Sequence, residues 1–355
     1  MEEKEKISTV ETTETEMKTV GDDLHGENLT DRVKMLSPMQ TVMKRFFRSK
    51  LSMVGLVALV FLFLFSFVGP FLSPWYQNGE VVRDPSTKIE VNEAGIGYEV
   101  NGESFTVYDV TFTQQAGNSK ADISWQHWLG TDETGKDIFT NLMLGGRVSL
   151  TLGFFVVILQ TIIGVFLGGV SGYFGGWVDQ IIMRIVEILY CIPQIPILLI
   201  LSAMFDEIED ISKLYYIMGV LCLIGWAGTA RLVRGQILSL REQDFMLAAK
   251  ASGLSTFSKI FKHLMPNVMP QLIVSMTLGL GSVILTEATL GFLGLGAPLG
   301  TATWGTMIGY AEDLIYLSNW PNFWLPAGIC ITGAILAFNF VGDGLRDAFD
   351  PKMKR

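Results

Sequence analysis

The chain alternates between long apolar runs and polar segments. Six runs contain no Asp, Glu, Lys or Arg: residues 51–72, 148–178, 188–205, 214–230, 264–286 and 314–342. A helix needs about 20 apolar residues to cross the hydrocarbon core of a bilayer, and most of these runs are long enough. Trimmed to helix length, they predict membrane spans at 51–71, 149–172, 181–204, 214–232, 268–290 and 323–343. The pattern therefore predicts an all-α membrane protein with six transmembrane helices.

Basic residues beside the spans predict the orientation. Short cytoplasmic loops are enriched in Lys and Arg. Lys and Arg gather before the first span, between the fourth and fifth spans, and after the sixth span. The short segment FDEIEDISK (205–213) is acidic, and residues 297–322 contain neither Lys nor Arg. We therefore expect both termini in the cytoplasm.

These features divide the chain into five parts. Residues 1–43 are polar and predict a disordered cytosolic tail, with a short helical patch near MQTVMKRFFRSK. The first span with its basic flank occupies 44–72, an extracellular insertion 73–136, the transmembrane core 137–346 and a cytosolic tail 347–355. In the insertion, KIEVNEAGIGYEVNGESFTVYDVTF alternates apolar and polar residues around Asn101-Gly102, a strong two-residue hairpin signal. We expect a small β-rich insertion, which could act as a spacer or as a docking surface.

Composition narrows the class further. Charged residues make up 17% of the chain, whereas soluble domains have about a quarter. The three cysteines lie inside apolar runs and are predicted to be small buried hydrophobes. The three histidines are scattered, so no metal site is expected. Nothing in the sequence suggests nucleic acid as a partner.

The segment GTDETGK (130–136) has the spacing of a phosphate-binding loop. Such a loop needs Ser or Thr at the next position, but Asp137 stands there. We expect instead a short amphipathic helix, ended by Gly145-Gly146 ahead of the second span. We find no catalytic triad, paired carboxylates or metal-ligand spacing. No catalytic residue, cofactor-binding residue or metal ligand is therefore predicted in this chain.

Small residues and prolines mark the spans. Gly164, Gly168, Gly172 and Gly176 recur every four residues, a spacing that lets membrane helices approach closely. A packing seam is the favoured interpretation, and a pore lining is the alternative. Pro193 and Pro196 interrupt the third span and predict a kink.

Two acidic residues lie within the spans. Glu187 follows Arg184 by one helical turn, which predicts a local ion pair. Glu287 could line a solute path, cap a nearby helix end or pair with another subunit. Arg184, Glu187, Glu287, Gly168 and Gly172 are therefore the candidates for lining the pathway or packing helices.

The polar segment DFMLAAKASGLSTFSKIFKHLMP (244–266) predicts a helix–turn–helix at the cytosolic face. Gly253 is placed to end the first helix in a left-handed cap, and Ser255 or Thr256 to start the second. Apolar residues then recur on one face, at Phe257, Ile260, Phe261 and Leu264, and we expect Pro266 to end the element. Such an amphipathic element could rest on membrane lipid or enter a groove on a soluble partner.

This segment resembles the EAA loop of ABC importer permeases. Ala248, Ala249 and Gly253 match its first part, and Ile260, His263 and Pro266 its second, whereas Leu247 stands in place of the family's glutamate. Four further stretches resemble the C-type permease subunit of dipeptide, oligopeptide and nickel importers: LGTDETGKDIFTNLMLGGRVSL, ILTEATLGFLGLG, WGTMI and FNFVGDGLRDAFDP. The resemblance covers the chain from about residue 128 to its end.

The resemblance implies the type I ABC importer permease fold in the plasma (inner) membrane. It implies a homologous second permease, two cytosolic ABC ATPases that hold ATP and magnesium, an extracellular solute-binding protein and a peptide substrate. In the implied coupling loop (236–267), Ala248, Ala249 and Gly253 allow close approach to an ATPase, and Phe257, Ile260 and Phe261 anchor it. Nickel remains an alternative substrate. A stand-alone secondary carrier and an ABC exporter are the rival classes.

Overall fold

The computed structural model describes residues 38–84, 95–100, 103–108, 118–205, 213–297 and 301–350. The chain divides into two compact units, residues 1–45 and residues 46–355. The described part of the first unit is the beginning of helix α2 (Pro38–Arg48), which confirms the helical patch predicted there. The rest of the predicted N-terminal tail lies outside the described residues.

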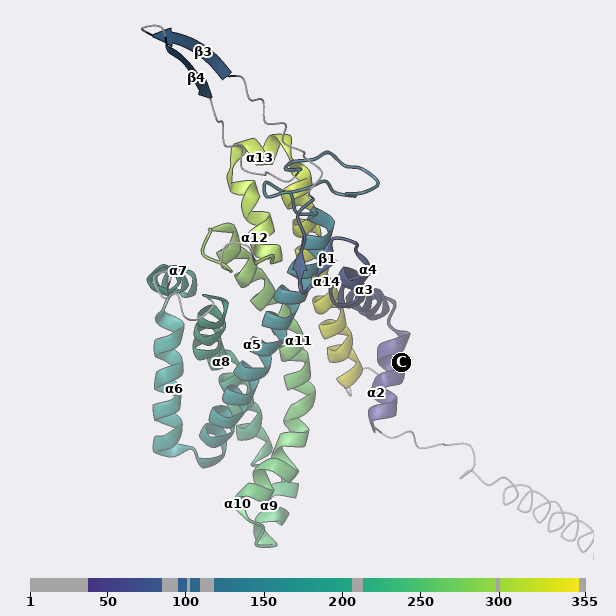
Figure 1. Cartoon of the computed structure of the whole chain (residues 1–355). Coiled ribbons are helices and arrows are strands. Elements are labelled where there is room, and N and C mark those ends of the chain that lie inside the picture. Colours follow the sequence, from purple (N-terminus) through teal and green to yellow (C-terminus); the bar gives the residue numbers. More distant parts are fainter. Residues whose placement is uncertain are drawn as a thin grey trace, which may run out of the picture. The chain divides into compact units, whose positions relative to one another are not determined.

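The second unit is built mainly from helices (Figure 1). The long helices are α3 (Lys50–Phe67), α5 (Ile138–Phe174), α6 (Gly176–Cys191), α7 (Gln194–Phe205), α8 (Lys213–Leu240), α11 (Met265–Phe292) and α14 (Pro321–Phe349). The short ones are α4 (Gly69–Leu72), α9 (Asp244–Ala251), α10 (Thr256–Ser258), α12 (Trp304–Ile308) and α13 (Leu314–Asn319). A π-helical turn (Lys259–Leu264) joins α10 to α11, and a 3-10 turn (Gly309–Glu312) follows α12.

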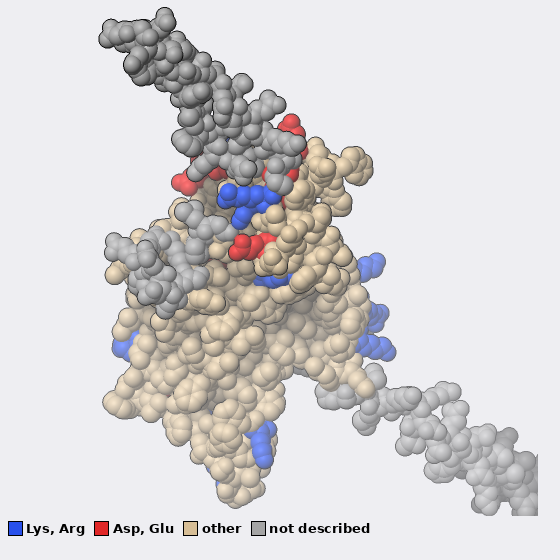
Figure 2. Space-filling model, in the orientation of Figure 1, with Lys and Arg blue, Asp and Glu red and all other residues tan. Residues whose placement is uncertain are grey.

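The described residues contain five helices long and apolar enough to cross a membrane, and six if the bent pair α6–α7 counts as one span. This confirms the predicted mostly helical membrane architecture, and the number of spans matches the six predicted when α6 and α7 are taken as one span. Figure 2 shows a broad band with little charge across the middle of the visible face, while charged side chains gather near the α13 end.

The third span is broken, as its prolines predict. Helix α6 ends at Cys191, α7 begins at Gln194, and the two helix axes differ by 80°. Pro193 cannot donate a backbone hydrogen bond and its ring crowds the preceding turn, so the helix is interrupted at this point.

Two predicted helix ends are wrong. Helix α5 runs without interruption from Ile138 to Phe174, so Gly145-Gly146 does not end a separate short helix. These glycines instead admit neighbours, because a Cβ at Gly145 would lie 3.0 Å from the Thr303 carbonyl carbon. Pro266 does not end its element either. It occupies the first turn of α11, where a missing N–H is tolerated, directly after the π-helical turn.

The strands form two antiparallel hairpins. β1 (Tyr76–Gln77) pairs with β2 (Glu80–Val81), and β3 (Gly95–Val100) pairs with β4 (Glu103–Tyr108). The second register closes at Val100 and Glu103, which confirms the predicted two-residue connection, although Asn101 and Gly102 themselves lie outside the described residues. Residues 118–137 form turns and isolated bridges, so the described strands of the insertion are confined to these hairpins.

The glycine seam of α5 packs against α8. A Cβ at Gly164 would lie 2.6 Å from Thr229 Cβ, and one at Gly172 would lie 3.0 Å from the Arg234 carbonyl oxygen. Gly168 faces the backbone of Ala230 even more closely. The packing interpretation is thus confirmed for these three glycines. Gly176 is not part of the seam, because it begins α6 with open space beside it.

The cysteine prediction is correct only in part. Cys222 is buried and Cys330 is half-buried, but Cys191 is exposed at the end of α6.

We expect Gly168→Ala to separate α5 from α8 and to lower the free energy of unfolding by about 1–3 kcal/mol, as overpacking does elsewhere. Gly235→Ala is the matched control, because an added Cβ on this α8 glycine meets nothing within 4 Å. Thermal unfolding of the purified chain in detergent measures both. Equal midpoints for the two variants would contradict the seam.

Candidate functional site

The segment between α8 and α11 has the capped helix–turn–helix predicted for it. Gly253 has φ +67°, and its N–H donates to the Lys250 carbonyl at 3.1 Å. The Leu254 N–H donates to the Ala249 carbonyl at 3.3 Å, which completes the turn after α9. The Ser255 hydroxyl accepts the Ser258 N–H at 3.3 Å and so caps α10. We refer to residues 244–264 as the knob, which lies at one end of the second unit (Figure 1).

Part of the knob is fixed in the core of the chain. Met246, Ile260 and Leu264 are buried in one cluster with residues of α8 and α11, namely Val233, Ile237, Val268 and Leu272. Ala249 is 5% exposed. Ile260, which sequence analysis placed on the partner-facing side, therefore anchors the knob to the spans.

Another part of the knob faces outward. Phe257 is 71% exposed and Phe261 47% exposed, and their ring centroids lie 4.4 Å apart. Leu247, in the position where the EAA pattern has glutamate, is 54% exposed. Ala248 and Gly253 are also exposed, whereas His263 is half-buried and Pro266 exposed on the α11 side. An exposed pair of aromatic rings of this kind is typical of a protein or membrane interaction site.

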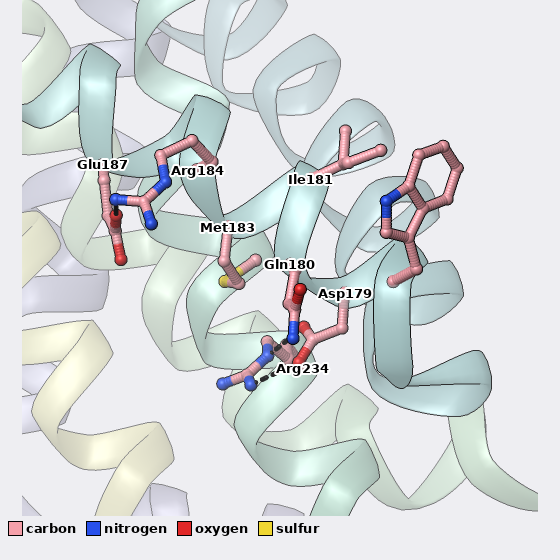
Figure 3. A pocket seen from close by; sticks show the side chains of 8 residues that line it. Asp179, Gln180, Ile181, Met183, Arg184, Glu187 and Arg234 are labelled. Atoms are coloured by element: carbon pink, nitrogen blue, oxygen red, sulfur yellow. Dashed lines mark hydrogen bonds and ion pairs between the residues drawn. The ribbon is translucent and has the colours of Figure 1, made fainter.

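A half-buried ion pair lies at the Gly172 end of the glycine seam. The Arg234 guanidinium of α8 donates to both carboxylate oxygens of Asp179 in α6, with Nη2 at 2.6 Å from Oδ2 (Figure 3). The Ser171 hydroxyl of α5 donates to the same carboxylate. This contact joins three helices. Sequence analysis missed it, although Asp179 interrupts an otherwise uncharged stretch and could have drawn attention.

A second ion pair lies further along α6, between two residues of that helix. Arg184 Nη1 donates to Glu187 Oε2 at 2.9 Å, which confirms the predicted local ion pair. Both side chains remain largely exposed, at 76% and 54%. Arg231 of α8 stacks on the ring of Tyr190 at 4.4 Å.

Glu287 of α11 is 2% exposed and enclosed by the chain itself. The Ser149 hydroxyl of α5 donates to its Oε2 at 2.9 Å and accepts the Trp304 N–H at 3.2 Å. A Cβ on Gly305 would lie 2.8 Å from Oε1, so the carboxylate rests against the start of α12. Of the three roles left open for Glu287, this arrangement supports bracing of a helix end.

A third polar cluster lies at the start of α5. His127 Nδ1 is 2.9 Å from Asp137 Oδ1, and its Nε2 is 3.3 Å from Asp84 Oδ2. All three side chains are buried, and the Trp75 ring stacks on the imidazole at 4.4 Å. The imidazole therefore bridges the two carboxylates, with one ring nitrogen within hydrogen-bond distance of each. Asp137 Oδ2 also accepts the Thr140 N–H at 2.8 Å, which caps α5.

The neighbouring GTDETGK turn uses its own backbone donors. The N–H groups of Thr134 and Lys136 donate to Asp132 Oδ1 at 2.8 and 2.9 Å. They are therefore already paired where a phosphate-binding loop would offer them to a ligand.

Burial, with the nearby charges of Asp132 and Glu133, raises the pKa of Tyr310 to about 12, so this phenol stays neutral. Among the described residues, no group of three or more His, Cys, Asp or Glu side chains could hold a metal ion.

Helices of this length and hydropathy are typical of a multi-pass membrane protein. The family model described as "Binding-protein-dependent transport system inner membrane component" matches residues 160–355. The model described as "N-terminal TM domain of oligopeptide transport permease C" matches residues 37–89.

Curated relatives agree with these matches. The dipeptide transport system permease protein DppC of Bacillus subtilis is 38% identical over 320 residues, covering 90% of this chain and 88% of the relative. The oligopeptide transport system permease protein OppC of the same organism is 36% identical over 324 residues, covering 91% and 92%. The inward-facing MetNI methionine ABC transporter is a solved structure with 20% identity and a TM-score of 0.48, covering 58% of this chain and 95% of that chain.

This chain belongs to the family of inner-membrane components of binding-protein-dependent transport systems. It is a multi-pass permease subunit, and the predicted resemblance to the C-type permeases of dipeptide and oligopeptide importers is confirmed.

We expect His127→Ala to leave Asp84 and Asp137 buried without the imidazole that lies between them. Removing one partner of a buried hydrogen bond costs about 1–3 kcal/mol. Glu133→Ala is the control, since Glu133 is an exposed partner of Lys120 at 3.9 Å and its loss should change stability by less than about 1 kcal/mol. Proteolytic susceptibility of the purified variants reports the difference, and indistinguishable cleavage would refute a structural role for His127.

The conformation of Gly253 leads to a graded prediction. The left-handed region costs an L-residue about 1–2 kcal/mol, and Asn tolerates it best. Gly253→Val should therefore distort the knob more than Gly253→Asn, although an added Cβ meets nothing within 4 Å. Hydrogen exchange of residues 244–264 should rise strongly in the valine variant and slightly in the asparagine variant. The reverse order would show that the backbone angle does not control the knob.

Proposed function

We propose that this chain is the permease subunit of an ATP-driven importer of dipeptides or oligopeptides. It forms the membrane pathway together with a homologous second permease. The names of the two Bacillus subtilis relatives, each similar to this chain over most of its length, support the peptide substrate.

Coupling to ATP takes place through the knob. The observation that carries this proposal is the exposed Phe257–Phe261 pair, presented by an element whose opposite side is fixed in the core. A partner that pushes on these rings moves α8 and α11 with them, because Ile260 and Leu264 link the knob to both helices. Exposed aromatic pairs of this kind act as anchors in protein interfaces, whereas Ala248 and Gly253 leave room for close approach.

The remaining parts of the assembly follow from this role. Two cytosolic ABC ATPases hold ATP and magnesium and hydrolyse the nucleotide, so this subunit contributes no catalytic residue. An extracellular binding protein delivers the solute to the side that carries residues 73–136. Both termini and the knob lie in the cytoplasm, in agreement with the distribution of Lys and Arg.

Replacing both exposed rings tests the coupling. In the Phe257→Ala/Phe261→Ala variant, we expect affinity for the co-expressed ATPases to fall by roughly 30-fold, equivalent to about 2 kcal/mol. Uptake of a radiolabelled dipeptide should fall with it. The measurements are co-purification of the ATPases and uptake into cells that lack the native permease.

Phe166→Ala is the matched control, because Phe166 is 63% exposed on the membrane-spanning helix α5 and lies outside the knob. It should retain the ATPases. Full ATPase binding and full uptake in the double variant would refute the coupling role. Energy-dependent uptake of nickel in place of dipeptide by the unmodified transporter would refute the peptide substrate.

A further inference from the structure

Helix α6 presents two different outer faces. Val186 is the buried residue that marks its packed side. Away from it, Trp177, Ile181, Ile185 and Ile188 form an exposed apolar face. Beside that face, Gln180, Arg184 and Glu187 recur at intervals of four and three residues and are all exposed. An apolar face suits lipid, but the polar one does not.

Arg231 of α8 extends this polar surface, because it is exposed and stacks on Tyr190 of α6. The two helices also meet through the Arg234–Asp179 ion pair. The pocket in Figure 3 is lined by seven residues of α6 between Trp177 and Glu187, the apolar Ile181 among them, together with Arg234 of α8. We call Gln180, Arg184, Glu187 and Arg231 the polar stripe.

Hydrocarbon is an unfavourable neighbour for this stripe. Each charged side chain at the centre of a spanning helix costs about 2.5–3.5 kcal/mol on insertion scales, and such groups normally face protein or a water-filled cavity. Arg184 and Glu187 lie 8 and 11 positions after the start of a 16-residue helix that is part of a membrane span. They pair with each other yet stay largely exposed, so several hydrogen-bonding groups remain available to water or solute.

We propose that the polar stripe lines the water-filled path through which the peptide crosses the membrane. This inference rests on the proposed function and adds the residues and the chemistry of the path. Arg184 lies beside Glu187, and the charge of Arg231 is directed onto an aromatic ring. The wall therefore offers donors and acceptors side by side without a strong field of one sign. Such a surface suits a zwitterionic solute rich in amide groups, because it hydrates either terminus and traps neither.

Adjacent cysteine substitutions test the path. Neighbouring residues of a helix differ by about 1.5 Å in depth but by about 100° in direction. Gln180→Cys and Glu187→Cys place a thiol on the stripe. Ile188→Cys places it on the apolar face at almost the same depth as residue 187, and Ile185→Cys places it on that face between the two stripe positions. The background carries Ser in place of Cys191, Cys222 and Cys330. Gln180→Cys leaves the ion pair intact, so the result does not depend on removing a charge.

The complete transporter in membrane vesicles is treated with a charged methanethiosulfonate, which reacts with thiolates in water. We expect Cys at 180 and 187 to react at least tenfold faster than Cys at 185 and 188, and tetraalanine with ATP to slow the reaction at 187. Labelling after denaturation confirms that every variant carries its thiol. Equal or reversed rates would overturn the proposal. A second result would also overturn it: Cys at 180 and 187 react in the isolated chain but not in the complete transporter. The stripe would then be covered by another subunit.

Uptake measured in parallel separates the two proposals. If the transporter imports tetraalanine while the labelling pattern is absent, the path is wrong and the peptide-importer function stands. If the pattern is present while neither a dipeptide nor tetraalanine is taken up, the path stands and the proposed substrate is wrong.

Discussion

The close approach of α5 to α8 is the constraint on which the rest of this structure depends. Lipid provides no hydrophobic drive between helices, so their association relies on van der Waals contact and hydrogen bonds. Gly164, Gly168 and Gly172 bring the α5 backbone against α8, and at the end of this contact Arg234 binds Asp179 of α6. The seam thereby fixes α8, and α8 with α11 carries the knob. The knob is therefore attached to the membrane spans through α8 and α11.

The charged groups within the spans are paired or hydrogen-bonded, but they differ in what they do. Glu287 is enclosed and bonded to Ser149, and Asp179 is bonded to Arg234, so these groups hold helices together. Arg184 and Glu187 are paired with each other but exposed. Pairing lowers the free-energy cost of keeping charged side chains in a membrane protein. The buried pairs hold helices together, whereas the exposed pair is open to water. Exposure of paired charges is therefore the observation that distinguishes a path from a packing contact.

Several elements were predictable because their causes are local. Span positions follow from uncharged runs, the break at Pro193 from the missing N–H, and the cap at Gly253 from its permitted backbone angle. The hairpin register that closes at Val100 and Glu103 is equally local, and so is the Arg184–Glu187 pair, one helical turn apart. The errors arose where one residue type serves two purposes. Gly145-Gly146 packs against α12 instead of ending a helix, and Pro266 starts a helix instead of ending one.

The sequence by itself determined the membrane class, the order of the spans, the capped knob and the family, because hydrophobic length, turn residues and contiguous motifs are all local properties. Only the tertiary structure decided which side chains meet across the fold. Asp179 and Arg234 are 55 residues apart, Ser149 and Glu287 are 138 apart, and His127 lies between two aspartates from different segments. It also decided that Ile260 points into the core while Phe257 and Phe261 face outward. Amphipathic spacing places apolar residues on one arc of a helix, but only the packing of α8 and α11 determines which part of that arc is covered.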